Sequence, residues 1–220
     1  MVVGREILDH LKPGETVLIK RTSIVEPIML LSEIAQWAKE RGYQIVISDI
    51  MDTLHRYKVH MELAGLNTAF INDTKVIKIG GSSKNGQVIG KLDISEPMVQ
   101  AHKFKKIYEP LLDGGVTVHI ILGLAKLFLH DESIKNVLER VHILSTLGDN
   151  KRHIVFLFID VDIVERSIPV AIPLLEEVAS TVIEVNVGKR EKSNIGKLAY
   201  KFAILKSVNN ELSGLEFTLI

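Results

Sequence analysis

The chain has 220 residues, 46% of them apolar and 25% charged, with 27 basic and 27 acidic side chains. This length suits a single domain over residues 1–220, and the balanced charge neither requires nor forbids a polyanionic partner. Cysteine is absent, which excludes disulfides, thiolate metal sites and a cysteine nucleophile.

The N-terminus carries Arg5, Glu6 and Asp9 too early for the apolar stretch of a signal peptide. No run of about 18 apolar residues free of charges occurs, so no membrane span is expected. We therefore expect a cytoplasmic protein. A cysteine-free composition rich in Lys, Glu, Ile and Val is also compatible with a thermophilic source.

Strand-like and helix-like segments alternate along the chain. Runs that are apolar on both faces predict strands of a parallel sheet covered by helices on both sides. Apolar residues at three- and four-residue spacings predict the intervening helices, the fourth with Asp131 as its N-cap. The expected strands are 16–19, 44–48, 116–122, 153–159 and 181–187, and the expected helices are 27–41, 52–64, 96–112, 131–147 and 167–179.

Two regions interrupt this alternation. Residues 75–92 contain two β-rich runs around a Gly/Ser/Asn-rich turn, and residues 198–220 contain two more around NNELSG. Both patterns predict antiparallel hairpins. The complete expectation is an α/β fold with a mainly parallel central sheet, right-handed crossovers and these two hairpins.

Several segments resemble the RecA-like P-loop ATPases, in particular the KaiC and RadA branch. LKPGETVLI is similar to the lead-in to their phosphate loop, and ERGYQIVISDI to their second strand. KRHIVFLFI and IPLLEEVASTVIEVN are similar to later elements of the same fold. The order of elements matches over nearly the whole chain. This resemblance implies a RecA-like fold, which by itself carries no activity. The pattern also resembles a small archaeal family without a known activity.

The phosphate loop implied by this resemblance lacks the residues that bind phosphate and magnesium. Its first glycine falls on Lys20, its second on Val25, its lysine on Glu26 and its hydroxyl on Pro27. Two unit charges ~4 Å apart interact by about 4 kcal/mol at an effective dielectric near 20, so exchanging the lysine for glutamate costs a phosphate roughly a thousandfold in affinity. The structural interpretation is that Glu26 and Pro27 begin a helix; the alternative keeps residues 20–23 as an anion contact.

The metal-binding carboxylate of the resemblance is replaced as well. Its position falls on Leu122 or, with a slip of one residue, on Gly123, and neither side chain binds magnesium. Hydrolysis of ATP is therefore not expected, and no cofactor and no bound metal are predicted.

Four carboxylates remain as candidate contacts at the carboxyl ends of strands. Asp49 and Asp52 follow the second strand and are expected to cap the next helix. Asp160 and Asp162 follow HIVFLFI; on an extended segment they would share a face, which leaves a paired metal site as the alternative to a structural role.

The segment 188–206 carries a local net charge of +5 with Tyr200 and Phe202 interleaved. Lys189, Arg190 and Lys192 could contact nucleic acid through its phosphates, although such a run is usually a solvated surface. The sequence thus predicts a non-catalytic domain that binds a protein or peptide, including a second copy or a competent RecA-like relative. Nucleotide binding without hydrolysis and nucleic-acid binding remain the alternatives.

Overall fold

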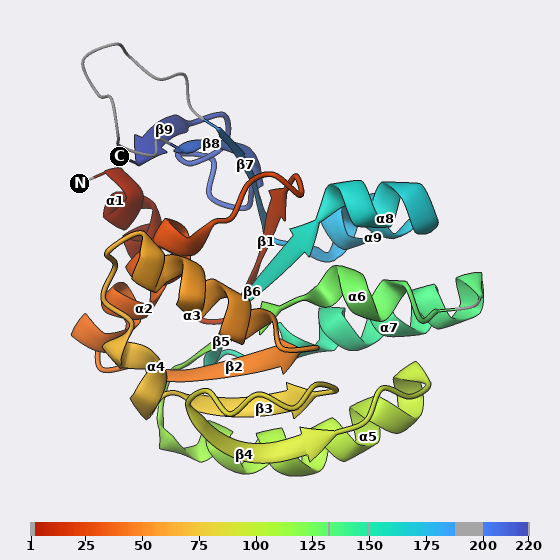
Figure 1. Ribbon diagram of the computed structural model, residues 1–220. Coiled ribbons are helices and arrows are strands. Elements are labelled where there is room, and N and C mark those ends of the chain that lie inside the picture. The colour runs from red at the N-terminus through yellow and green to blue at the C-terminus, as the bar shows by residue number, and fades with distance from the viewer. Residues whose placement is uncertain (1–2, 132, 149, 188–199, 220) are drawn as a thin grey trace.

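Residues 3–131, 133–148, 150–187 and 200–219 are described by a computed structural model, in which helices cover both faces of one sheet (Figure 1). Within these residues the sheet has nine strands in the order β4-β3-β2-β5-β6-β1-β7-β8-β9. The strands are β1 Glu15–Arg21, β2 Gln44–Ile50, β3 Lys75–Ile79, β4 Gln87–Leu92, β5 Thr117–Leu122, β6 His153–Asp160, β7 Thr181–Val187, β8 Tyr200–Ser207 and β9 Glu216–Leu219.

The helices form two layers, one on each face of the sheet. Buried side chains of α1 to α4 belong to one apolar cluster, and those of α5 to α9 belong to the other. The helices are α1 Val3–His10, α2 Ile28–Glu40, α3 Thr53–Leu63, α4 Ala69–Asp73, α5 Pro97–Tyr108, the 3-10 helix η1 Glu109–Gly114, α6 Leu124–Phe128, α7 Ile134–Leu147, α8 Val161–Ser167 and α9 Ala171–Val178.

The five apolar runs form β1, β2, β5, β6 and β7, as the sequence predicts, and β1 to β7 pair in parallel. All residues of β5 and β6 are buried, because each lies in the middle of the sheet with a helical layer on either side. The predicted C-terminal hairpin is confirmed: β8 pairs antiparallel with β7 and with β9.

The predicted antiparallel hairpin at 75–92 is wrong, because β3 and β4 pair in parallel. Residues 80–86 run back along the sheet, so the N–H of Gln87 donates to the carbonyl of Thr74 at 2.8 Å. Seven extended residues span up to about 24 Å, which exceeds the roughly 17 Å of a five-residue strand. Gly80 and Gly81 both have positive φ and turn the chain at the end of β3.

Two helix expectations also need correction. The N-cap of α7 is Ser133, whose hydroxyl accepts from the N–H of Asn136 at 3.2 Å; Asp131 instead binds Arg140 through two hydrogen bonds of 2.7 Å. The helix expected at 167–179 is α9 alone, and the chain has already formed α8 directly after β6. The short helices α6 and α8 follow β5 and β6 with almost no linker. The sequence therefore has no run of loop residues that would indicate where these helices begin.

The connections change face at two switch points along the carboxyl edge of the sheet, the first between β1 and β6 and the second between β2 and β5. The helices that follow β1 and β2 lie on one face, whereas those that follow β5 and β6 lie on the other. Neighbouring strands therefore send their connections to opposite faces between β1 and β6 and between β2 and β5. Ligands of open α/β sheets bind at such positions. Within the described residues, no helix is long and apolar enough to cross a membrane.

Candidate functional site

The loop after β1 lies at the first switch point and surrounds the side chain of Arg21. Arg21 is the last residue of β1 and is 7% exposed. Its Nη1 donates to the carbonyl oxygens of Thr22 and Val25 at 3.1 and 3.0 Å and lies 3.2 Å from Oδ2 of Asp160. The loop thus directs carbonyl oxygens toward a guanidinium, whereas a phosphate cradle directs N–H groups toward an anion.

Two N–H groups of this loop have protein partners too. The N–H of Ser23 donates to Asp162 at 2.7 Å, and the N–H of Val25 donates to the carbonyl of Thr22 at 3.0 Å. The Ser23 hydroxyl donates to Asp160 at 2.8 Å. These contacts leave Val25 buried and draw the loop against the beginning of α8.

Two of the remaining phosphate-loop positions, Lys20 and Glu26, form ion pairs with neighbouring helices. Lys20 lies 2.5 Å from Glu176 of α9. Glu26 pairs with Arg56 at 3.0 Å and contacts His60 of α3. Pro27 is the N-cap of α2, so Glu26 lies just outside that helix and turns toward α3. The expected helix-start carboxylate is therefore bound mainly by Arg56 and His60 of the neighbouring helix.

The metal position of the resemblance is part of the apolar core. Leu122 is fully buried at the end of β5. Gly123 follows with φ of +84°, and a Cβ there would meet the carbonyl oxygen of Ile50 at 2.7 Å and collide with Thr53. Glycine is needed because α6 and α3 begin close together at this point.

Asp160 and Asp162 do not share the face of an extended strand, because α8 begins at Val161. Asp160 ends β6 and caps α8, accepting from the N–H of Ile163 at 3.3 Å, while Asp162 lies in the first turn. Both contact Ser23. Among the described residues, no group of three or more His, Cys, Asp or Glu side chains is arranged to hold a metal ion.

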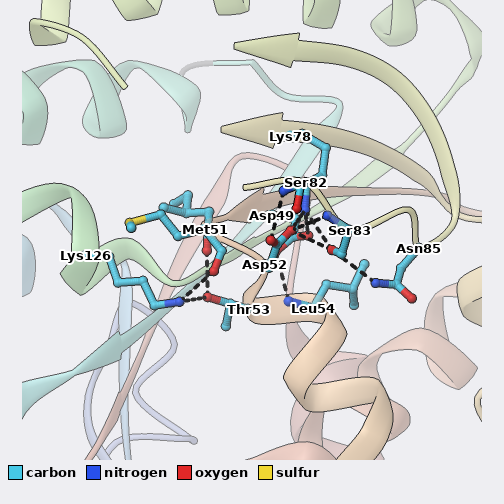
Figure 2. Close-up of polar contacts among 11 residues, drawn as sticks. Asp49, Met51, Asp52, Thr53, Leu54, Lys78, Ser82, Ser83, Asn85 and Lys126 are labelled. Carbon is cyan, nitrogen blue, oxygen red and sulfur yellow. Dashed lines mark hydrogen bonds and ion pairs between the residues drawn. The ribbon is translucent and has the colours of Figure 1, made fainter. Parts of the chain in front are cut away.

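Asp49 and Asp52 meet at Lys78, beside the second switch point (Figure 2). Asp49 is fully buried; its Oδ2 lies 2.6 Å from Nζ of Lys78, and its Oδ1 accepts from the N–H of Leu54 at 2.9 Å. Asp49 thus caps the start of α3, as the sequence predicts. Asp52 is the N-cap residue of α3, but its side chain makes no capping hydrogen bond. It pairs instead with Lys78 and accepts from the N–H groups of Ser82 and Ser83 at 2.9 Å.

These contacts shift the pKa values of Asp52 and Lys78 in the directions that keep both side chains charged. Burial raises the pKa of Asp52, but hydrogen bonds from Lys78 and Ser83 outweigh it and hold this pKa well below its usual range. Burial likewise lowers the pKa of Lys78, and the bonds to Asp49 and Asp52 raise it above its ordinary value. The triad of Asp49, Asp52 and Lys78 is therefore a stable ion cluster.

The backbone beside this triad adopts a rare conformation. Met51 and Asp52 have φ of +48° and +59°, and a Cβ at Gly81 would meet Asp52 at 2.6 Å. Such strain needs surrounding contacts that fix it. Here Asp52 holds residues 82 and 83, which begin the return from β3 to β4. The triad's local role is thus to anchor this crossover.

Lys126 of α6 lies at the second switch point and contacts the start of α3. Its Nζ donates to the carbonyl of Met51 and to Oγ1 of Thr53, both at 2.9 Å (Figure 2). Burial lowers its pKa, with a further contribution from Arg56. Lys126 thereby joins the two helical layers. Its ammonium group is bound by Met51 and Thr53 of the same chain.

The basic segment lies largely outside the described residues, including Lys189, Arg190 and Lys192. Its described part is paired: Lys201 lies 2.6 Å from Glu216, and Lys206 donates to the carbonyl of Glu176 at 2.7 Å. The nucleic-acid prediction therefore rests on residues 188–199 alone.

A different group of polar residues was missed by the sequence reasoning. Tyr108, His119 and His153 are buried on the α5 side of the sheet, with ring centroids of Tyr108 and His119 4.6 Å apart and those of Tyr108 and His153 5.2 Å apart. The only signal was the presence of polar residues within apolar strands, Ser48 in QIVIS and His119 in VTVHIIL.

Comparison with solved structures places the fold in a known class. The KaiC-like protein PH0186 of Pyrococcus horikoshii OT3 is similar with a TM-score of 0.59, 14% identity and 94% of this chain and 85% of that chain covered. The flagellar accessory protein FlaH of Methanocaldococcus jannaschii is similar with a TM-score of 0.58, 14% identity and 97% and 90% coverage. The chain has a RecA-like α/β fold.

A second Pyrococcus horikoshii OT3 protein, known from a structural study as PH0250, is more similar. Its TM-score is 0.79 at 27% identity, with 96% of this chain and 95% of that chain covered. The chain belongs to the family described as Pyrococcus protein of unknown function, DUF257, whose model matches residues 6–218. No match is found among curated proteins.

Proposed function

We propose that this chain is a single RecA-like domain, residues 1–220, that does not hydrolyse ATP and acts in the cytoplasm by binding a protein partner. The observation that carries the loss of hydrolysis is the loop after β1. There Arg21 occupies the centre of the loop and draws the carbonyl oxygens of Thr22 and Val25 toward itself. A triphosphate in this place would face carbonyl oxygens and the carboxylate of Asp160.

Two ion pairs at the end of β1 support this proposal. Arg21 is neutralised by Asp160, and Lys20 by Glu176. To bind a phosphate, the protein would have to break a buried ion pair, which costs about 3–5 kcal/mol when one partner is left unpaired. The end of β5 offers only Leu122 in place of a metal-binding carboxylate.

A protein partner is supported by the open side of the sheet. β4 is the terminal strand of the sheet order, and no described strand pairs with its outer edge. Its side chains alternate in exposure, and Ile89 is 38% exposed. An extended segment of a partner, including a second copy or a competent RecA-like relative, could pair with this edge through its backbone.

Calorimetric titration with millimolar ATP and Mg²⁺, followed by a phosphate-release assay, tests the first half of the proposal. We expect neither heat of one-site binding nor release of phosphate, while an active RecA-like ATPase measured in parallel gives both. Turnover that disappears in the Glu26→Gln variant would overturn the proposal. Saturable heat without turnover would instead support nucleotide binding without hydrolysis.

Sedimentation, alone and mixed with a competent RecA-like relative, tests the second half. We expect a complex that the Ile89→Lys variant weakens, because a lysine on an edge strand opposes pairing with another strand. Leu63→Lys is the matched control, since Leu63 is 82% exposed at the end of α3. Only monomers at high concentration in both experiments would contradict protein binding. Salt-dependent retention of an oligonucleotide that is lost on neutralising Lys189, Arg190 and Lys192 would favour nucleic acid.

A further inference from the structure

A cavity of about 680 Å³ lies between the sheet and the helices α5 and α7. Its walls are mainly apolar and include Ile50 and Ile121 from the sheet, Phe104 from α5, Leu127 from α6 and Leu144 from α7. Pockets for small molecules have this size and this largely apolar character, with a few polar groups that fix the ligand. The exposed residues Lys105, Glu109, Thr146 and Lys151 mark where it reaches the surface.

The cavity wall contains polar groups with unused hydrogen-bonding capacity. Tyr108 and His153 line the cavity and are 3% and 2% exposed. Among the described residues, the Tyr108 hydroxyl and Nε2 of His153 are buried without a hydrogen-bond partner, as is Nδ1 of the adjacent His119. An unpaired buried polar group costs about 1–3 kcal/mol, so several in one place call for an explanation.

The protonation of the histidines defines what these groups can bind. Burial, with His153 nearby, lowers the pKa of His119 to about 3, and burial also lowers the pKa of His153. Both rings are therefore neutral at pH 7. Nδ1 of His153 lies 3.3 Å from the carbonyl oxygen of Leu147 and must carry its proton there, so Nε2 is an acceptor. Tyr108 supplies a hydroxyl that can donate or accept.

Among the described residues, the buried part of the cavity wall offers no unpaired charge to a ligand. Arg140, which also lines it, is held by Asp131 through two bonds of 2.7 Å and donates to Gln100 at 3.1 Å. A charged ligand would lose its hydration without gaining a counter-ion. An uncharged ligand avoids this cost and still gains the apolar contacts of α5 and α7.

We propose that this cavity is a binding site for an uncharged, largely apolar small molecule that carries a hydrogen-bonding group, which the Tyr108 hydroxyl and Nε2 of His153 bind. Both atoms are buried, so a ligand group that pairs with them must displace the side chains that cover them. The site lies on the opposite face of the sheet from α2 and α3, and it does not depend on the loop after β1 or on the partner proposed above.

Titration with N-phenyl-1-naphthylamine, an uncharged amine whose fluorescence rises in apolar surroundings, tests the site. We expect a saturable signal with one molecule bound per chain. The Ala101→Phe variant adds a ring to the α5 wall and is expected to weaken binding at least tenfold. Ala64→Phe is the matched control because Ala64 is exposed at the end of α3, and its affinity should equal that of the wild type.

Ile143→Phe, which narrows the cavity from α7, serves as the second variant, and thermal unfolding shows which variants are folded. Absence of saturable binding to the wild type would overturn the proposal. Binding that both folded cavity variants leave unchanged would do the same, since the probe would then sit elsewhere.

The polar contact is tested by comparing this amine with 1-benzylnaphthalene, a hydrocarbon of similar shape. The Tyr108→Phe variant should bind the amine about 2- to 10-fold more weakly, the range expected for one hydrogen bond, and should bind the hydrocarbon as tightly as the wild type. An equal change for both probes would overturn the role of the hydroxyl.

Discussion

The loop after β1 and the cavity beneath α5 both bury polar side chains, but they differ in how those side chains are satisfied. Around Arg21 the buried charges and the N–H groups of Ser23 and Val25 have partners within the chain. Around Tyr108 the hydroxyl and two histidine nitrogens have none among the described residues. A satisfied cluster holds the fold together, whereas an unsatisfied one is the place where a ligand can add hydrogen bonds.

The largest expected effect comes from breaking the satisfied cluster. Arg21→Met removes the partner of Asp160, which is 6% exposed, and should lower the free energy of unfolding by about 3–5 kcal/mol because a carboxylate is left buried and unpaired. Denaturant unfolding measures this. The same substitution at Arg41, whose pair with Asp9 is exposed, should change little. Equal effects at both positions would mean that the loop is not held by this pair.

A smaller effect concerns acid stability on the cavity side. Because burial and His153 lower the pKa of His119 to about 3, the unfolded chain binds a proton below pH 6.5 that the folded chain does not. Stability should therefore fall by about 1.4 kcal/mol per pH unit between pH 6.5 and 4.5 for this residue. His119→Gln should flatten this dependence, while the exposed His102→Gln should not. Identical pH profiles for wild type and His119→Gln would disprove the assignment.

The smallest expected change in the free energy of unfolding is positive in the cavity and negative beside Arg21. Tyr108→Phe removes a hydroxyl without a partner and should raise the free energy of unfolding by about 1 kcal/mol. Tyr57→Phe removes an equally buried hydroxyl that interacts with Arg21 and should lower it by a similar amount. Thermal and denaturant unfolding of the two variants give the comparison. Destabilisation of both would show that Tyr108 has a partner in the folded protein.

Much of the architecture follows from local sequence. Apolar runs such as HIVFLFI specify strands buried on both faces, and Gly42 ends α2 with a positive φ. The position of Asp49 directly after a strand correctly predicted that it caps α3, since that role needs only neighbouring residues. That Lys20, Val25, Glu26 and Pro27 replace the glycines, the lysine and the hydroxyl of a phosphate loop rests on the resemblance and stays a prediction.

The sequence by itself determined the mainly parallel sheet and the order of its five apolar strands, because these depend on periodicity and residue type. Only the tertiary structure decided that β3 and β4 run in parallel, that Asp52 holds the return between them, and that Arg21 fills the loop after β1. It also brought Tyr108 and His153 into one cavity wall from segments that are 45 residues apart. Strand direction, ion pairing and cavities arise from contacts between distant residues, which local patterns do not encode.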